Sequence, residues 1–526
     1  MHRCFQIPEL LDEIATKLLP AYDPRHHGFV QIKKGRRDVL ALALTCKAFL
    51  EPSLDILWRD LDSMFPLLHV LDVIPTRDLW PDYRGSSTCR VYMSVTAMKE
   101  LRLLAEAKWD RLDYYSPRVR SLLVDQYHPP VYKTMLQYHQ KTLGSAVTPN
   151  LRSLVWRVPD EEHFGFIPFC GPNLAFLTIK PPNLEISAPK IAGMLGNSLS
   201  GLEELVFLYE GREETTRKQD AYVSNLVLYA PSLRLVKSNF HHPSPEAFAR
   251  IVTMPHLETL TLSTLPPEPW PYLSPRAPAS VPFLPAIRSL RLCRSRLDVI
   301  SRFLQAVDNM KQLERLKIEL HKEDRNTAVG GCIATVGNLC FAALVDFYLS
   351  PDQIHSDLAD GRGRVDAFRV SQAMLSPLLP FKNMEECKIH VQSLDIDDTF
   401  LESVATSWPS LRVLVLLPLQ WHKEESNLTL PGLLPLAKNC PHLYFVELNF
   451  NRRATAEDMR MWLSRMVRTW DHSETVGTLP GLDLWLRDLE RSAGGQLREV
   501  AGRLKAVFPN VRSTADAAIN NWLPKL

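Results

Sequence analysis

The chain has 526 residues, of which 45% are hydrophobic and 23% are charged. This composition excludes a mostly disordered chain, because such chains carry few apolar residues and a high net charge. Sixty-one basic residues face 59 acidic ones, and the net charge of +2 argues against a general nucleic-acid binder, whose binding domain would be clearly basic. The 40 prolines outnumber the 21 glycines, which disfavours glycine-rich phosphate loops and favours many stiff turns.

The first helix is predicted to open at Pro8, since proline suits the first position of a helix. It continues to Leu18 or Leu19, with Leu10 and Ile14 on the same face as Leu18. A helix of this length buries little apolar surface alone, so it needs neighbours.

Two more helices follow a polar stretch at 23–37, and they complete a three-helix module over residues 1–61. The second helix, 39–50, is apolar nearly all round and must be covered on most sides, and the third spans 51–61. We expect the basic run at 33–37 to lie in an exposed loop, although such runs also act as nuclear localisation signals. Because the module is small, it would gain stability from a partner or from docking on the rest of the chain.

A short phrase recurs along the middle of the chain: a turn residue, often proline, then apolar-x-x-apolar-x-apolar. Its last two apolar positions share one face of an extended strand, and the proline before it fixes a corner. The copies recur at a mean interval of about 29 residues, which indicates a repeat array. Their first apolar positions are Val119, Leu151, Leu174, Leu202, Leu233, Leu257, Ile287, Leu313, Leu344, Met384, Leu411 and Leu443.

Helical segments are predicted between the strands, at Arg296–Val307, Asp398–Ser407 and Leu433–Asn439. The run Asp395-x-Asp397-Asp398 is expected to cap the helix from Thr399, because aspartate favours helix N-caps and a calcium-binding loop would need a glycine and a distal glutamate. A strand followed by a helix every 20 to 35 residues or so resembles a leucine-rich repeat, here in a degenerate form.

These patterns predict an α/β fold in four parts. Residues 1–61 form the helical module, 62–116 a helical linker, and 117–453 a leucine-rich-repeat-like solenoid with parallel strands inside and helices outside. Residues 454–526 have amphipathic spacing and are predicted to form a helical cap over the last repeat. Loops are expected at 350–364 and in the proline-rich stretch 266–282.

The N-terminal module has an apolar residue, proline and Glu-Leu at its start, then a leucine-rich helix that leads to Cys-Lys and an aromatic residue, and a closing Leu-Trp. The residues of this pattern are Ile7, Pro8, Glu9, Leu10, Leu11 and Ile14, then Leu40, Leu42, Leu44, Cys46, Lys47, Phe49, Leu57 and Trp58. With this pattern the module resembles an F-box, and the chain, with degenerate repeats after it, is similar to the F-box families of mushroom-type fungi. The polar stretch at 23–37 is longer than in the family pattern and is a departure from it.

This resemblance implies the substrate-recognition subunit of a Skp-cullin-F-box (SCF) ubiquitin ligase, a subunit that is not itself an enzyme. The F-box would bind the Skp adaptor and through it a cullin-RING scaffold, while the repeats recruit a protein substrate that the sequence does not identify. The alternative is a binding scaffold outside any ligase, whose F-box-like helices pack on its own repeats. The candidate adaptor contacts are Ile7, Pro8, Leu10, Leu11, Ile14, Leu42, Leu44 and Leu57.

Catalytic motifs are missing from the sequence, which contains no GxSxG, HExxH or P-loop, so we expect no catalytic residues, metal or cofactor. The pair Gly330-Gly331, with Gly337, is expected to form a turn. The nine scattered cysteines suit buried thiols in a reducing compartment, and no apolar run approaches the length of a membrane span. We therefore expect a cytoplasmic or nuclear protein with no nucleic-acid or membrane partner.

Overall fold

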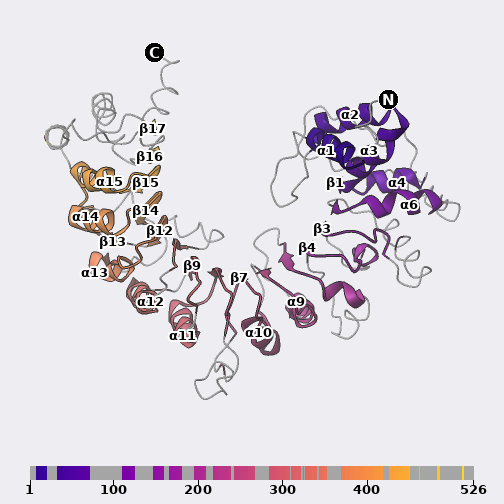
Figure 1. The fold of residues 1–526 in the computed structure, drawn as a ribbon. Coiled ribbons are helices and arrows are strands. Elements are labelled where there is room, and N and C mark those ends of the chain that lie inside the picture. Colours follow the sequence, from indigo (N-terminus) through magenta and orange to yellow (C-terminus); the bar gives the residue numbers. More distant parts are fainter. Residues whose placement is uncertain are drawn as a thin grey trace, which may run out of the picture. The chain divides into compact units, whose positions relative to one another are not determined.

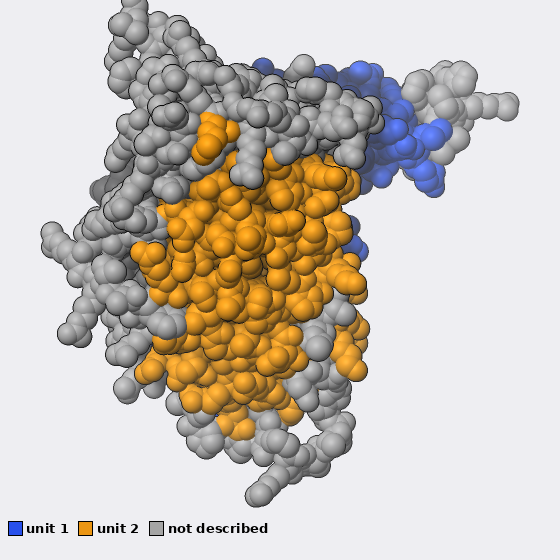
Figure 2. Space-filling model, turned by 90° about the vertical axis from the view of Figure 1, so that its left-hand side faces the viewer, with its two compact units in different colours: residues 1–251 blue, residues 252–526 orange. Residues whose placement is uncertain are grey.

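The chain folds as an α/β protein in a computed structural model that describes residues 8–19, 32–71, 109–124, 135, 146–158, 165–180, 195–208, 217–238, 242–266, 270, 283–307, 310–321, 324, 326–339, 343–351, 369–391, 393–418, 426–449, 461, 483–485 and 512–513. It divides into two compact units, residues 1–251 and 252–526, which Figure 2 colours separately.

The first unit begins with helices and continues as a parallel sheet. Strands β1 to β6 pair in chain order, each parallel to the next. The elements are α1 (Pro8–Leu18), α2 (Ile32–Ala43), α3 (Lys47–Arg59), β1 (Asp60–Leu61), α4 (Phe65–Val70), α6 (Trp109–Tyr115), the 3-10 helix η3 (Ser116–Arg118), β2 (Ser121–Val124), β3 (Ser153–Trp156), η4 (Ile167–Phe169), β4 (Phe176–Ile179), η5 (Gly196–Leu199), β5 (Glu204–Phe207), α9 (Arg217–Tyr229), β6 (Leu235–Ser238) and α10 (Pro245–Val252).

The second unit repeats the same arrangement, with its helices along one side of the strands (Figure 1). Its main strands run in the order β7-β8-β9-β10-β12-β14-β15-β16-β17, and a separate parallel pair joins β11 to β13. The elements are β7 (Thr259–Leu262), β8 (Ser289–Leu292), α11 (Leu297–Ala306), β9 (Arg315–Leu320), α12 (Asn326–Asn338), β10 (Asp346–Pro351), β11 (Val370–Ser371), α13 (Gln372–Leu375), η8 (Ser376–Leu378), β12 (Glu386–Val391), β13 (Leu394–Asp395), α14 (Asp398–Ser407), β14 (Val413–Pro418), η9 (Leu430–Gly432), α15 (Leu433–Asn439), β15 (Phe445–Leu448), β16 (Asp483–Trp485) and β17 (Arg512–Ser513).

Each copy of the repeated phrase forms a strand, which confirms the predicted parallel α/β repeats. In every copy the strand starts two residues after the first apolar position, from Ser121 after Val119 to Phe445 after Leu443. All of these first positions are buried, as are the apolar residues three positions later. The phrase therefore marks where the chain turns inward and where the sheet begins.

Backbone and side-chain hydrogen bonds join neighbouring corners. The amide of Asn150 donates to the carbonyl oxygen of Pro117 at 2.9 Å, and that of Asn173 donates to the carbonyl of Pro149 at 3.2 Å. The Pro-Asn pair in the phrase thus links one repeat to the one before it, in addition to stopping any preceding helix.

The predicted helices between strands are confirmed. Helix α11 buries Leu297, Ile300, Phe303 and Leu304, and α14 and α15 have the predicted bounds. Asp397 caps α14 by accepting hydrogen bonds from the backbone N–H groups of Thr399 and Phe400 at 3.0 and 3.2 Å. The hydrogen bond from the Thr399 hydroxyl and these two backbone hydrogen bonds lower the pKa of Asp397.

The basic run 33–37 is not in a loop, which corrects the prediction. Helix α2 starts at Ile32 and includes it, so the break after α1 is shorter than the polar composition suggested. The guanidinium of Arg36 donates to the backbone oxygen of Asp60 at 2.7 Å and lies 3.3 Å from a carboxylate oxygen of Asp62. The sequence did not distinguish the two cases, because the exposed face of a helix can be as rich in basic residues as a loop.

The predicted helical cap at 454–526 is wrong at two described places. Strands β16 and β17 lie there and extend the parallel sheet, with Leu484 beside Val446 and Ser513 beside Leu484. The repeated phrase does not identify β16, because Gly481 stands where the other copies have their first apolar residue. The first two residues of the predicted loop 350–364, Ser350 and Pro351, belong to strand β10 instead. Residues 352–364, most of 266–282 and the rest of 454–526, apart from residue 461, lie outside the described residues.

The glycines expected in a turn instead lie in helix α12, where Gly330 and Gly337, but not Gly331, allow close packing. A Cβ at Gly337 would lie 2.5 Å from the Cβ of Pro377 and 2.7 Å from its carbonyl oxygen. A Cβ at Gly331 would meet no atom within 4 Å. Gly337 is therefore required by the approach of η8 to α12, whereas Gly331 is not.

We predict that Gly337→Ala lowers the free energy of unfolding by about 1–3 kcal/mol, the usual cost of overpacking. Gly331→Ala is the matched control on the same helix, and it should raise stability by up to about 1 kcal/mol because alanine is the better helix former. Chemical denaturation followed by circular dichroism measures both. Equal effects of the two substitutions would contradict the packing argument.

Candidate protein-binding surface

Three N-terminal helices pack around a small apolar core. Leu19, Val39 and Ile56 are buried together, and Leu42 and Leu57 pack against them. Helix α1 contacts both α2 and α3, and α2 contacts α3. Glu9 lies in the first turn of α1 and Lys17 in the last, which suits the helix dipole.

Two of these helices carry leucines and an isoleucine on their outside. On α1, Leu10 is 40% exposed and Ile14 41%, with Leu18 one turn further along. Leu44, in the turn directly after α2, is 78% exposed, and Leu40 lies one turn earlier, on α2 itself. Large apolar side chains at helical spacing on a protein surface mark a protein-interaction site more often than isolated ones do. We call Leu10, Ile14, Leu18, Leu40 and Leu44 the leucine face.

The predicted adaptor contacts divide into three groups. Leu10, Ile14 and Leu44 are exposed, whereas Leu11 is buried and Leu42 and Leu57 pack on the core of the module. Ile7 lies outside the described residues, and Pro8 begins α1 but its side chain is not described. Three further exposed leucines are not among the predicted adaptor contacts: Leu18, Leu40 and, on α3, Leu50. Leu18 continues the four-residue spacing of Leu10 and Ile14, a signal already present in the sequence.

Helix α3 is bound by α6 and η3, the segment that precedes strand β2. The hydroxyl of Tyr114 donates to Glu51 at 2.6 Å, and the guanidinium of Arg118 donates to Glu51 at 2.5 Å and to Asp55. The Tyr114 and Arg118 hydrogen bonds lower the pKa of Glu51. The ring of Trp58 stacks on Tyr115 at 4.6 Å between centroids.

Strand β1 follows α3 directly and joins the sheet of the repeats. Asp60 lies beside Ser121 and Leu61 beside Leu122 in parallel register. The backbone N–H of Arg120 donates to the carbonyl of Arg59 at 2.8 Å. The module is thus tied to the first repeat by side chains and by backbone hydrogen bonds.

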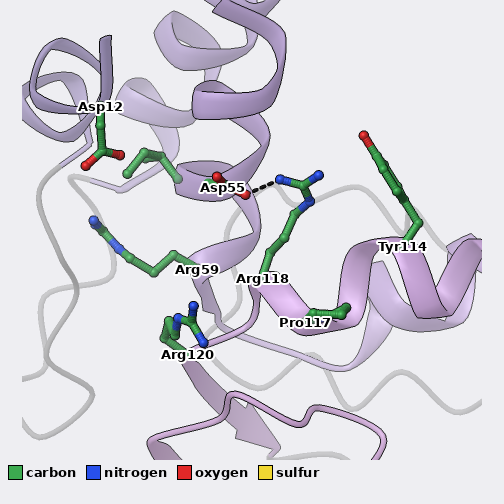
Figure 3. A pocket seen from close by; sticks show the side chains of 8 residues that line it. Asp12, Asp55, Arg59, Tyr114, Pro117, Arg118 and Arg120 are labelled. Atoms are coloured by element: carbon green, nitrogen blue, oxygen red, sulfur yellow. Dashed lines mark hydrogen bonds and ion pairs between the residues drawn. The ribbon is translucent and has the colours of Figure 1, made fainter. Parts of the chain in front are cut away.

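A pocket of about 520 Å³ lies at this junction (Figure 3). Three of the charged groups in its wall are paired within the protein. Arg118 pairs with Asp55, and Arg59 donates to Asp60 at 2.9 Å and to the carbonyl of Leu19 at 3.2 Å. Such pairing suits a structural junction better than a reaction site. The sequence gave no sign of this pocket, which is lined by Asp12, Asp55, Ile56, Arg59, Tyr114, Pro117, Arg118 and Arg120.

Metal and thiol chemistry find no support in the described part of the chain. No group of three His, Cys, Asp or Glu side chains there could hold a metal ion. Burial raises the pKa of the thiols of Cys332, Cys387 and Cys440 to about 12. Such thiols are protonated at neutral pH and do not act as nucleophiles. Among the described helices, none combines the length and the apolar character that a bilayer crossing requires.

Comparison with known proteins finds likenesses among solved structures. No protein-family model matches the chain, and no curated protein matches it. Among solved structures, an internalin from Listeria monocytogenes matches over 68% of this chain and 88% of its own, at 14% sequence identity and a TM-score of 0.36. The parallel register of the strands itself shows that the fold is an α/β repeat array.

We predict that Leu10→Ser/Ile14→Ser lowers the free energy of unfolding by no more than about 1 kcal/mol per site, because 40% of Leu10 and 41% of Ile14 are already exposed. Leu11→Ala, the buried neighbour on the same helix, should cost about 2–5 kcal/mol. Urea denaturation followed by circular dichroism compares the two. A large loss of stability in the double variant would show that the leucine face is covered in the folded chain.

Proposed function

We propose that the chain is the substrate-recognition subunit of an SCF ubiquitin ligase. The leucine face would bind the Skp adaptor, which connects to a cullin-RING scaffold, and the repeats would hold a protein substrate. The chain itself catalyses nothing in this proposal. It raises the concentration of a substrate lysine near the conjugating enzyme by binding both partners at once.

The observation that carries the proposal is the division of labour between the helices. Helix α3 is held through Glu51, Asp55 and Trp58 by the segment before the first repeat strand. Leu10 and Ile14 of α1, and Leu44 just after α2, are exposed. A scaffold whose F-box-like helices existed only to pack on the repeats would have no use for these exposed leucines. The F-box pattern of the sequence and the repeat array that follows it support the same assignment.

Binding of a partner to the leucine face is favourable on energetic grounds. Burying a leucine or isoleucine side chain contributes about 1.5–3 kcal/mol. The buried free thiols of Cys170, Cys293 and Cys387 fit a reducing compartment, so the proposal places the protein in the cytoplasm or nucleus.

The test is co-purification of the full chain with the Skp adaptor of the same organism. We expect a stable complex with the wild type and a loss of affinity of about tenfold or more in Leu10→Ser/Ile14→Ser. Burying the exposed part of these two side chains, 40% and 41% of their surface, contributes about 1.2–2.4 kcal/mol. Tyr229→Ser, which removes an equally exposed ring from α9, is the control and should bind normally.

Two results would overturn the proposal. One is a folded wild type that fails to bind the adaptor. The other is equal binding by the double variant and the Tyr229→Ser control, which would place the adaptor elsewhere on the chain. The first result would leave a binding scaffold outside the ligase as the function to test next, and the second would remove the leucine face as the adaptor site.

A further inference from the structure

The residue directly before each strand of the main sheet occupies the same place in successive repeats. The backbone N–H of Arg120 donates to the carbonyl oxygen of Arg59 at 2.8 Å, and that of Arg152 donates to the carbonyl oxygen of Arg120 at 2.8 Å. We call these residues the ladder residues. The described ladder residues are Arg59, Arg120, Arg152, Ala175, Glu203 and Arg234 in the first unit, and Glu258, Arg288, Glu314, Val345, Glu385, Arg412 and Tyr444 in the second.

In the second unit, neighbouring charged ladder residues of opposite sign form ion pairs. Nη1 of Arg288 lies 2.7 Å from Oε1 of Glu314, and Nη1 of Arg412 lies 3.1 Å from Oε2 of Glu385. Opposite charges side by side on adjacent strands stabilise a sheet, whereas like charges there destabilise it. These two arginines are therefore neutralised within the ladder itself.

Three arginines occupy consecutive ladder positions at the start of the first unit. Arg59 is neutralised, because its Nε lies 2.9 Å from the Asp60 carboxylate. Arg120 and Arg152 are exposed, and the structure gives neither of them an ion pair with a described residue. On the other side of Arg152 the ladder continues with Ala175, which has no charge. Two like charges therefore lie side by side without a described carboxylate to balance them.

Arg120 also borders the pocket of about 520 Å³ at the junction, below Arg59 and Arg118 in Figure 3. Its Nη1 donates to the backbone oxygen of Asn150 at 3.2 Å, which holds the guanidinium at the corner of the next repeat. Arg59 and Arg118 are bound to carboxylates, whereas Asp12, the remaining carboxylate of the wall, makes no ion pair with Arg120. Within the described wall, Arg120 is thus the cation that has room for an anion.

We propose that Arg120 and Arg152, which we call the phosphate site, bind a phosphate group that is free or carried by a peptide. Neighbouring strands lie about 4.8 Å apart, so the two guanidinium groups can donate to the oxygens of one phosphate. A phosphate monoester carries a charge of about −1.5 to −2 at pH 7 and balances both arginines, whereas a carboxylate balances one. The bound anion would also remove the repulsion between the two like charges.

The phosphate site and the leucine face lie on different sides of α1. Asp12 borders the pocket, and Leu10 and Ile14 are each two residues away from it, about 200° round the helix. An adaptor on the leucine face therefore leaves the phosphate site open. The phosphate site goes beyond the proposed function and does not rest on it, so each can fail without the other.

The experiment is isothermal titration calorimetry of the full chain at fixed ionic strength. The probes are inorganic phosphate, a peptide with one phosphoserine, and the same peptide with glutamate in that place. We expect at least one phosphate probe to bind, and the glutamate peptide to bind more weakly. Tighter binding of the phosphoserine peptide than of inorganic phosphate would support a phosphate on a protein, and the reverse order would support free phosphate.

Two outcomes of this titration would overturn the proposal. One is a folded chain that binds neither phosphate probe. The other is equal binding of the glutamate and phosphoserine peptides, since the charge of a phosphate would then make no difference.

The variant Arg120→Gln/Arg152→Gln should weaken phosphate binding at least about tenfold, because it removes both donors of charge-assisted hydrogen bonds. Its matched control is Arg288→Gln/Arg412→Gln, which removes two arginines from the same ladder position where each has a carboxylate partner. The control should bind phosphate within about twofold of the wild type, because neither arginine belongs to the phosphate site. Equal losses in the two variants would show general electrostatic attraction and overturn the assignment to Arg120 and Arg152.

If the Arg120→Gln/Arg152→Gln variant is less stable than the wild type, Arg152→Glu decides instead. This substitution puts a carboxylate next to Arg120, in the way that Glu314 lies next to Arg288. We expect Arg152→Glu to unfold at a urea concentration no lower than that of the wild type and to lose phosphate binding. A folded Arg152→Glu variant that binds phosphate as tightly as the wild type would contradict the proposal.

Discussion

Every strand of the sheet depends on its neighbours for its backbone hydrogen bonds. A repeat contributes four to six residues of strand, and parallel pairing with the repeats on either side satisfies their N–H and C=O groups. The first apolar residue of each phrase lies under this ladder and is fully covered only when the next repeat is present. Long-range structure therefore comes from a local rule applied many times, and no single repeat could form the core alone.

That local rule explains what the sequence could predict. The strands of all twelve phrase copies follow from apolar residues at fixed spacing, because burial at those positions tolerates little variation. Helices α11, α14 and α15 follow from amphipathic spacing for the same reason. The rule does not predict β16, because Gly481 stands in place of the first apolar residue of the phrase. The strand still pairs with β15 through its backbone.

Other features could not be predicted because they depend on contacts between distant segments. A glycine pair normally suggests a turn, but Gly337 lies in a helix against Pro377. The basic run at 33–37 is helical, with Arg36 bound to the chain near Asp60. The sequence pattern likewise did not show that Leu10 is exposed and Leu11 buried. Only the packing of α1 against α2 and α3 distinguishes the two residues.

The pairing of β1 with β2 sets an order of events during synthesis. Asp60 and its partner Ser121 are 61 residues apart in the chain. A ribosome adding about 5–20 residues per second needs about 3–12 s to make that interval. For those seconds α3 has no Tyr114 or Arg118 to hold it, and the edge of β1 has no partner. The nascent helices are then an apolar surface with an open strand beside it, a target for chaperones until the first repeat emerges.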